Sequence, residues 1–361
     1  MNLETSLGGM KFKNPLMPAS GPLVGDNEKM KIISDYGVGG MVTKTISRKG
    51  AEVVRPCIFG GKDFIMNAEL WSEYDPEVWI NEFLPNIKKE IDKPLFISVG
   101  YSKGDMEYLI PKLDKFADAF EISTHYVGKD LTTIKETLKT IRKYTDKPVY
   151  MKMSPHIPDP VGFVKMVIEN GGNGIVAINS LGPTMKIDIS SRKVLVGNTE
   201  GEVWTSGPAI KPIALALVHK IKKALPQCEI IGVGGISTAE DIIEFLLAGA
   251  SAVQMLSAAM LKGKDLYKKI INDLPSALEK YGFDSIEEVI NTKLETGNVK
   301  YEPSYPSIDY DKCVNCKLCE NICPYFAINS KNKKVVVDKS ECFGCGLCQS
   351  KCPKQAIENV F

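Results

Sequence analysis

Short apolar runs alternate along most of this chain with longer stretches in which apolar residues recur every three or four positions. The runs hold four or five residues rich in Val, Ile, Met and Phe, which is typical of strands buried on both faces. The longer stretches have the periodicity of amphipathic helices. The expected strands are residues 16–19, 40–44, 95–99, 119–122, 149–152, 174–178, 230–234 and 252–255, and the clearest helices are 106–117, 131–144, 161–170, 210–224 and 239–248.

A succession of eight strand-and-helix units predicts an α/β fold, the parallel (β/α)8 or TIM barrel. An open doubly wound sheet uses the same alternation, and short apolar runs do not by themselves separate the two. Residues 3–12 alternate around Gly8 and Gly9 and predict a small hairpin that caps the bottom of the barrel. Because such a barrel takes about 250 residues, the chain of 361 residues has room for a second, smaller domain.

Two strand-to-helix connections, residues 45–75 and 179–207, are much longer than the usual length of about 2–6 residues. Long loops at this end of a barrel usually build the active site or its lid. After the last helical region, the prolines in residues 297–310 predict an extended linker. The expected domains are therefore a barrel over 1–296, a linker over 297–310 and a small domain over 311–361.

Two cysteine runs fill the small domain. Each reads C-x2-C-x2-C-x3-C-P, and the second run, from Cys342, repeats the first, from Cys313, at an offset of 29 residues. This is the spacing of bacterial ferredoxins, which are small α+β domains that hold [4Fe-4S] clusters. A zinc site or a disulfide framework would also use cysteines, but zinc rarely takes eight thiolates in this register. Because the fourth Cys of each run ligates the other cluster in two-cluster ferredoxins, the expected ligand sets are Cys313, Cys316, Cys319 and Cys352 for one cluster and Cys323, Cys342, Cys345 and Cys348 for the other.

Composition narrows the possible partners. The 45 basic residues nearly balance the 44 acidic ones, which leaves no electrostatic case for binding nucleic acid or an anionic membrane. No stretch approaches the roughly 18 apolar residues of a membrane span, and the first residues do not have the pattern of a signal peptide. Only Cys57 and Cys228 lie outside the two runs, so nothing suggests oxidative folding. We therefore expect a cytoplasmic protein.

Iron–sulfur clusters pass single electrons, whereas most dehydrogenations of small molecules move two. A flavin mononucleotide (FMN) in the barrel would meet both demands, with its phosphate held after the last two strands, where Gly234 and Gly235 precede a helix. Lys152 would then lie near the N1/O2 edge of the flavin; the alternative for Lys44 and Lys152 is a surface lysine that extends its charge into water. No G-x-G-x-x-G motif is present, so a nicotinamide cofactor in a Rossmann fold is not expected.

Seven segments of the barrel resemble, in family order, the dihydroorotate dehydrogenases of the first class. They are residues 14–21, 43–45, 151–155, 177–180, 206–214, 234–236 and 253–258. With the cysteine runs included, the chain is still more similar to the flavin and cluster portions of dihydropyrimidine dehydrogenase. The resemblance covers nearly the whole chain, and it implies a homodimer.

The resemblance also implies site residues. The implied FMN contacts are Ala19, Ser20, Lys44, Thr45, Asn67, Lys152, Asn179, Ser206, Gly207, Gly234, Gly235 and Ser257. The implied substrate contacts are Asn67, Ser123, Asn179 and Ser180, whose polar side chains would hydrogen-bond an imide or carboxamide ring.

The chain departs from the family at residues 121–128. The family motif there reads Glu-Leu-Asn-x-Ser-Cys-Pro, with Asn on the substrate and Cys as the acid/base, whereas this chain has Ser123 in place of the Asn and Tyr126 in place of the Cys. Tyr126 or His125 is therefore the predicted proton donor or acceptor. In the alternative interpretation the loop is only repacked and the proton comes from water or another group. The other residues to consider are His156, which follows the neighbouring strand, Cys57, the only remote thiol in the long second loop, and His219, expected on a helix surface.

These observations predict an oxidoreductase that acts on a carbon–carbon bond beside a carbonyl (CH–CH class) in a small, cyclic substrate. FMN and two [4Fe-4S] clusters are the expected cofactors. A redox partner, either a ferredoxin or a flavoprotein subunit that handles NAD(P)H, would exchange electrons with the clusters. Two alternatives stay open: an electron-transfer subunit that has lost its own substrate, and a dihydroorotate or dihydropyrimidine dehydrogenase that uses an acid/base other than Cys.

Overall fold

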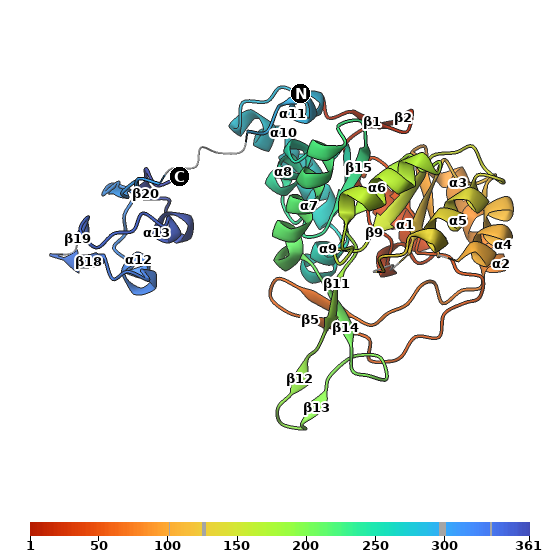
Figure 1. The fold of residues 1–361 in the computed structure, drawn as a ribbon, viewed down its shortest axis with the longest axis horizontal. Helices are drawn as coiled ribbons and strands as arrows, with labels where there is room; N and C mark the ends of the chain where they lie inside the picture. Colours follow the sequence, from red (N-terminus) through yellow and green to blue (C-terminus); the bar gives the residue numbers. More distant parts are fainter. Residues whose placement is uncertain (101, 125–127, 296–300, 333) are drawn as a thin grey trace. The chain divides into compact units, whose positions relative to one another are not determined.

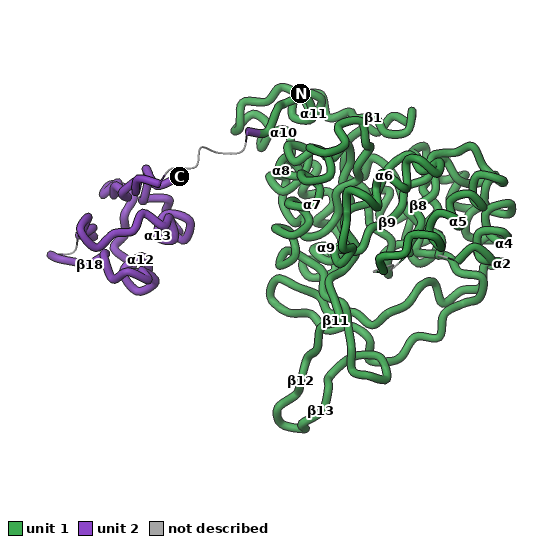
Figure 2. The backbone as a smooth tube through the Cα atoms, in the orientation of Figure 1, with its two compact units in different colours: residues 1–294 green, residues 295–361 purple. Residues whose placement is uncertain are grey.

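The computed structural model describes the chain except for residues 101, 125–127, 296–300 and 333. It divides into two compact units, Met1–Leu294 and Glu295–Phe361 (Figure 2). Ser307 and Ile308, which lie inside the stretch predicted as a linker, form a short strand of the second unit. The limits of the predicted domains otherwise stay a prediction.

A parallel eight-stranded sheet forms the centre of the first unit (Figure 1). Its order is β3-β16-β15-β10-β9-β8-β7-β4, and the Gly39 N–H donates to the Leu16 carbonyl across the remaining gap between β3 and β4 (2.8 Å). This nearly closed sheet confirms the predicted barrel against the open alternative. Its strands are β3 (Leu16–Pro18), β4 (Met41–Val42), β7 (Leu95–Val99), β8 (Ala119–Ser123), β9 (Val149–Met153), β10 (Gly174–Ala177), β15 (Glu229–Val233) and β16 (Ala252–Met255).

Helices surround the barrel and bury their apolar faces against it. Several begin at polar residues that cap the free N–H groups of the first turn, such as Asp26, Ser102 and Thr238. They are α1 (Asn27–Asp35), α2 (Pro76–Val78), α3 (Leu84–Glu90), α4 (Lys103–Leu113), α5 (Thr132–Ile141), α6 (Pro160–Glu169), α7 (Lys211–Ala224), α8 (Ala239–Leu247), α9 (Ser257–Lys262), α10 (Leu266–Lys280) and α11 (Ile286–Asn291), with shorter turns at η1 (Pro22–Val24), η2 (Trp79–Phe83) and η3 (Pro208–Ile210).

A hairpin of β1 (Thr5–Leu7) and β2 (Met10–Phe12) covers the amino-terminal end of the barrel, as the sequence predicts. The Gly8 N–H donates to Glu229 Oε1 (2.8 Å), and the Tyr150 hydroxyl donates to Glu229 Oε2 (2.6 Å). Because Glu229 begins β15, these bonds fasten the hairpin to the bottom of the sheet. The opposite, carboxyl-terminal end is therefore the one left for a site.

The two long connections pair with each other, which the sequence did not predict. They form a four-stranded sheet in the order β11-β14-β6-β5, from β5 (Ile58–Gly60), β6 (Ile65–Asn67), β11 (Leu181–Thr184) and β14 (Val203–Ser206). A further hairpin, β12 (Ile187–Asp188) and β13 (Lys193–Val194), extends from it. Since β6 and β14 are antiparallel neighbours, with Asn67 opposite Trp204, residues far apart in sequence meet beside the strand ends.

The second unit is built from two similar halves. Its elements are β17 (Ser307–Ile308), α12 (Leu318–Ile322), β18 (Ile328–Lys331), β19 (Lys334–Val337), α13 (Leu347–Lys351) and β20 (Ile357–Glu358), and the strands pair as β17-β20 and β18-β19. In the described part of the chain, none of the helices combines the length and apolarity needed to span a membrane.

Candidate functional site

Lys152 lies inside the carboxyl-terminal end of the barrel, on β9. Its ammonium group is 3.2 Å from Oε1 of Glu121 on the neighbouring strand β8, and the Glu121 side chain is fully buried. On β16, the Gln254 amide donates to the other oxygen of Glu121 (2.7 Å). The polar side chains of three strands therefore hold the Lys152 charge in place, and Lys152 is not the surface lysine of the alternative interpretation.

Lys44, two residues after β4, is also buried. Its ammonium group donates to Glu69 Oε1 and to Glu73 Oε2, both at 2.7 Å. Burial opposes ionisation of Glu73, but the hydrogen bond from Lys44, a backbone hydrogen bond and the charges of Lys44 and Arg55 together lower the pKa of that carboxyl. The Lys44 ammonium thus lies between two carboxylates of the long loop 45–75. Neither glutamate was predicted from the sequence as a site residue.

Three hydroxyls form a chain between the first strands. The Ser20 and Thr45 hydroxyls lie 3.0 Å apart, and the Thr45 hydroxyl lies 2.9 Å from that of Ser98 on β7. Ala19 directly follows β3 and is buried. The structure therefore brings together Ala19, Ser20 and Thr45, three of the residues predicted to contact FMN.

A second group of predicted FMN residues meets after β14, β15 and β16. The Ser206 and Ser257 hydroxyls are 2.7 Å apart, and Gly207, Gly234 and Gly235 all have positive φ, which suits glycine. This end of the barrel thus combines backbone turns with two hydroxyls, a donor set that fits a phosphate.

The start of α8 is less open to an anion than the sequence suggests. Oδ2 of Asp241 accepts the N–H groups of Ser237 and Thr238, and the Thr238 hydroxyl accepts the Asp241 N–H in return. This capping box uses the N–H groups of Ser237, Thr238 and Asp241. Donors for a phosphate are therefore left at the turn through Gly234 and at Ser257.

The predicted substrate residues come from three places. Ser123 ends β8 opposite Lys152, Asn67 ends β6, and Asn179 and Ser180 follow β10. Oδ1 of Asn67 accepts the Glu69 N–H (2.5 Å), and Oδ1 of Asn179 accepts the Ser180 N–H (2.9 Å). Both amides are thus oriented by their own loops.

The candidate proton donors and acceptors are His125, Tyr126, His156, His219 and Cys57, and those that the structure describes differ in position and exposure. His125 and Tyr126, the predicted acid/base pair, lie outside the described residues. His156 is exposed, and its Nε2 accepts the Gly182 N–H at 3.3 Å, while His219 is half-buried on α7. Burial, and after it the charge of nearby Glu69, raise the pKa of the Cys57 thiol, so this thiol is protonated at neutral pH. Cys57 belongs to the same loop, residues 45–75, as the two glutamates that bind Lys44.

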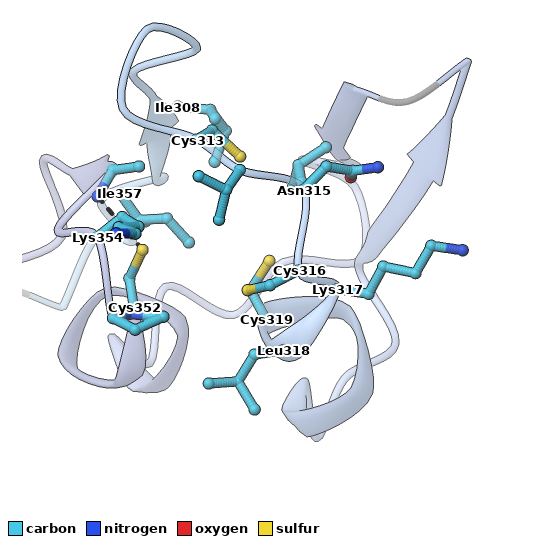
Figure 3. A pocket seen from close by; sticks show the side chains of 14 residues that line it. Ile308, Cys313, Asn315, Cys316, Lys317, Leu318, Cys319, Cys352, Lys354 and Ile357 are labelled. Carbon is cyan, nitrogen blue, oxygen red and sulfur yellow. Dashed lines mark hydrogen bonds between the residues drawn. The ribbon is translucent and has the colours of Figure 1, made fainter.

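In the second unit, two cavities are each lined by four cysteines. The first cavity is shown in Figure 3 and contains Cys313, Cys316 and Cys319 of the first run with Cys352 of the second. The second cavity contains Cys342, Cys345 and Cys348 with Cys323. Each cavity thus takes three thiols from one run and one from the other, the same division that the sequence predicts for the ligands.

Comparison with known proteins agrees with both units. Residues 2–278 match the family model described as dihydroorotate dehydrogenase, and residues 306–359 match a 4Fe-4S dicluster domain. The chain is 35% identical over 306 residues to a protein of Pyrococcus horikoshii named "Dihydroorotate dehydrogenase B (NAD(+)), catalytic subunit", with 81% of this chain and 98% of the relative covered. It is 33% identical over 316 residues to "Dihydroorotate dehydrogenase A (fumarate)" of Lactobacillus helveticus, with 83% and 99% covered.

Proposed function

Because this chain belongs to the dihydroorotate dehydrogenase family, we propose that it transfers electrons between a small cyclic substrate and a redox partner through FMN and two [4Fe-4S] clusters. The chain is an oxidoreductase of the CH–CH class that carries a 4Fe-4S dicluster domain. The substrate, the number of clusters and the partner are the parts that we propose. The observation that carries the proposal is the buried Lys152, fixed by Glu121 and Gln254 among the strand ends.

The residues at the strand ends fit FMN. Ser206, Ser257 and the turn at Gly234 offer hydroxyl and backbone donors to a phosphate. Lys152 would stabilise negative charge on the pyrimidine edge of the flavin, and Glu121 orients this lysine. Bound FMN would supply hydride transfer to the substrate and single-electron exchange with the clusters.

The cysteines of the two cavities would hold the clusters. Four thiolates around each cavity are the donor set that a [4Fe-4S] cluster takes. The partner would be a protein that hands single electrons to these clusters, either a ferredoxin or a flavoprotein subunit that handles NAD(P)H. The words "catalytic subunit" and "NAD(+)" in the name of the Pyrococcus relative favour the second kind of partner.

The remaining residues would bind the substrate and move a proton. Asn67, Asn179 and Ser180 would hydrogen-bond the carbonyl groups and stabilise the enolate that develops as hydride is transferred. Tyr126, or else His125, would exchange the proton at the adjacent carbon. A pure electron-transfer subunit, the alternative, has no use for two amides oriented in this way.

We expect the anaerobic protein, with its flavin reduced by light, to be reoxidised by a small cyclic acceptor whose C=C bond is conjugated to a carbonyl. Tyr126→Phe should slow that reoxidation strongly, by roughly 10²–10⁴-fold, while FMN stays bound. Stopped-flow absorbance of the flavin measures both. Reoxidation by the redox partner alone, with no acceptor active, would favour the electron-transfer subunit, and near-normal rates in Tyr126→Phe would move the proton to His125 or another group.

The charges around Lys44 favour an uncharged substrate over a carboxylate such as dihydroorotate. Glu69 lies two positions after the substrate residue Asn67, and together with Glu73 it binds the ammonium of Lys44. The exposed Arg55 also acts on Glu73. A substrate carboxylate here would meet two like charges, whereas a neutral imide ring would not.

We therefore expect uracil, a neutral imide, to bind at least about 10-fold more tightly than its carboxylate analogue orotate, since one like-charge contact costs about 1.4 kcal/mol or more. Glu69→Gln should narrow the difference by improving the binding of orotate. Titration of the flavin absorbance gives both dissociation constants, with the substitution Glu52→Gln of an exposed glutamate in the same loop as the matched control. Tighter binding of orotate by the wild type would contradict this preference.

A further inference from the structure

The two halves of the second unit can be compared position by position. Their backbones share the left-handed conformation at equivalent places: Asn315 with Gly344, and Lys317 with Gly346. These pairs keep the offset of 29 residues that separates the cysteine runs. Because the backbone is repeated, differences between the two cavities come from side chains.

Both cavities have a largely apolar lining, but the first also includes two lysines and an asparagine at positions where the second has glycine or an aromatic ring. Lys354 of the first cavity has Tyr325 as its counterpart, and Lys317 has Gly346. Val314 is replaced by the larger Phe343. Figure 3 shows Lys317 on the loop of the first run, pointing outward beside the cavity.

The charges close to the cysteines follow the same division. Within two residues of the first set, Lys317, Lys351 and Lys354 face two acidic residues, Asp311 and Glu320. A fourth lysine, Lys312, is neutralised by Asp309 and Glu358, at 2.9 and 3.1 Å. Within two residues of Cys323, Cys342, Cys345 and Cys348, the sequence has one charged side chain, that of Glu341.

The second cavity is also better shielded from water. The rings of Tyr325 and Phe343, which both line it, stack on each other with centroids 4.8 Å apart and planes 17° apart. The C-terminal Phe361 ring covers Gly346 so closely that an added Cβ would lie 2.5 Å from it. Cys348 is buried, whereas its counterpart Cys319 is only partly buried.

From this asymmetry, and resting on the two-cluster proposal above, we infer that the cluster held by Cys313, Cys316, Cys319 and Cys352 has the higher reduction potential. Reduction adds one negative charge to a cluster, so nearby cations and water favour it, and an apolar, shielded cavity disfavours it. Charge and solvent exposure act in the same direction here.

The inference fixes where an electron rests. When the two clusters share one electron, that electron would pass from the second cluster to the first. The first cluster would then be reduced and the second oxidised. The side chains that set this order are Lys317 and Lys354 on one side and Tyr325 and Phe343 on the other. An electron donor would therefore fill the first cluster before the second.

Redox titration of the full, cluster-loaded chain, followed by electron paramagnetic resonance, tests the order. We expect two potentials in the wild type. Cys345→Ala, which removes a ligand of the second cluster, should keep the higher one, and Cys316→Ala should keep the lower one. Retention of the lower potential by Cys345→Ala, or equal potentials for the two clusters, would overturn the inference.

Substitutions at equivalent positions give a sharper test. The double variant Lys317→Gln/Lys354→Gln should shift the higher potential downward and leave the lower one in place, and Phe343→Val should raise only the lower one. Lys331→Gln, an exposed lysine that lines neither cavity, is the matched control and should change neither. A shift of the lower potential by the lysine variant would overturn the assignment. Iron near four atoms per wild-type chain would instead contradict the two-cluster proposal and the inference with it.

Discussion

Replacement of Lys152 by methionine is expected to lower the free energy of unfolding of the barrel by about 3–5 kcal/mol, because it leaves the buried Glu121 carboxylate without its cation. Gln254 still donates to Glu121, but one amide does not replace an ammonium. The same change should abolish turnover, since it removes the only cation that we place at the flavin pyrimidine edge. Few single substitutions in this chain should cost as much.

A double variant separates the two effects. In Lys152→Met/Glu121→Gln no buried charge is left over, so most of the stability should return while turnover stays lost. Urea unfolding followed by circular dichroism measures the first quantity, and anaerobic reoxidation of the flavin measures the second. Lys13→Met, which breaks the exposed pair with Asp92, is the control and should change neither. Equal destabilisation by the single and double variants would show that Lys152 acts through packing.

The barrel could be predicted from the sequence because each strand is a short apolar run between amphipathic helices. All eight predicted strands are present, and their ends differ from the prediction by two residues at most. The FMN contacts stay a prediction that rests on the resemblance, and several of them, such as Ala19 and Ser257, lie just after barrel strands. Local pattern was sufficient for these features since each depends on neighbours in sequence.

Contacts between distant segments could not be predicted in this way. The sheet of β11, β14, β6 and β5 joins two loops more than a hundred residues apart, and neither loop has the alternation of a long strand. Nothing in the sequence distinguishes Glu69 and Glu73 from other acidic loop residues, yet both accept hydrogen bonds from Lys44. Glu121 and Gln254 lie within short apolar runs and were not predicted as site residues. A polar or charged residue in the middle of a buried strand is the signal that could have indicated them.

The paired loops make the acid/base question more specific. Asn67 and Ser206 are held on adjacent strands of the same small sheet, so residues 45–75 and 179–207 together shape this side of the candidate site. Cys57 directly precedes β5 of this sheet, and its carbonyl accepts the Ala68 N–H. Its protonated thiol is therefore a further candidate for the acid/base role predicted for Tyr126 or His125, and Cys57→Ala can be compared directly with Tyr126→Phe in the reoxidation assay.

Pairs of cysteine substitutions are expected to show that each cluster takes ligands from both runs. Cys313 and Cys352 line the same cavity although 39 positions separate their numbers, whereas Cys313 and Cys323 belong to one run and to different cavities. A [4Fe-4S] cluster needs four thiolates, so the loss of one ligand should remove about four of about eight iron atoms per chain. The double variant Cys313→Ala/Cys352→Ala should therefore keep about four iron atoms, as many as either single variant.

The double variant Cys313→Ala/Cys323→Ala should lose nearly all iron, because it removes one ligand from each cavity. Iron analysis together with electron paramagnetic resonance of the reduced, anaerobically purified protein gives the count for each variant. Cys228→Ala, a buried thiol of the barrel, is the control and should keep all of the iron. If each run held its own cluster the two results would be exchanged, with Cys313→Ala/Cys323→Ala keeping one cluster and Cys313→Ala/Cys352→Ala keeping none. The crossed result would also establish that the two halves fold as one unit, since neither run could complete a cluster by itself.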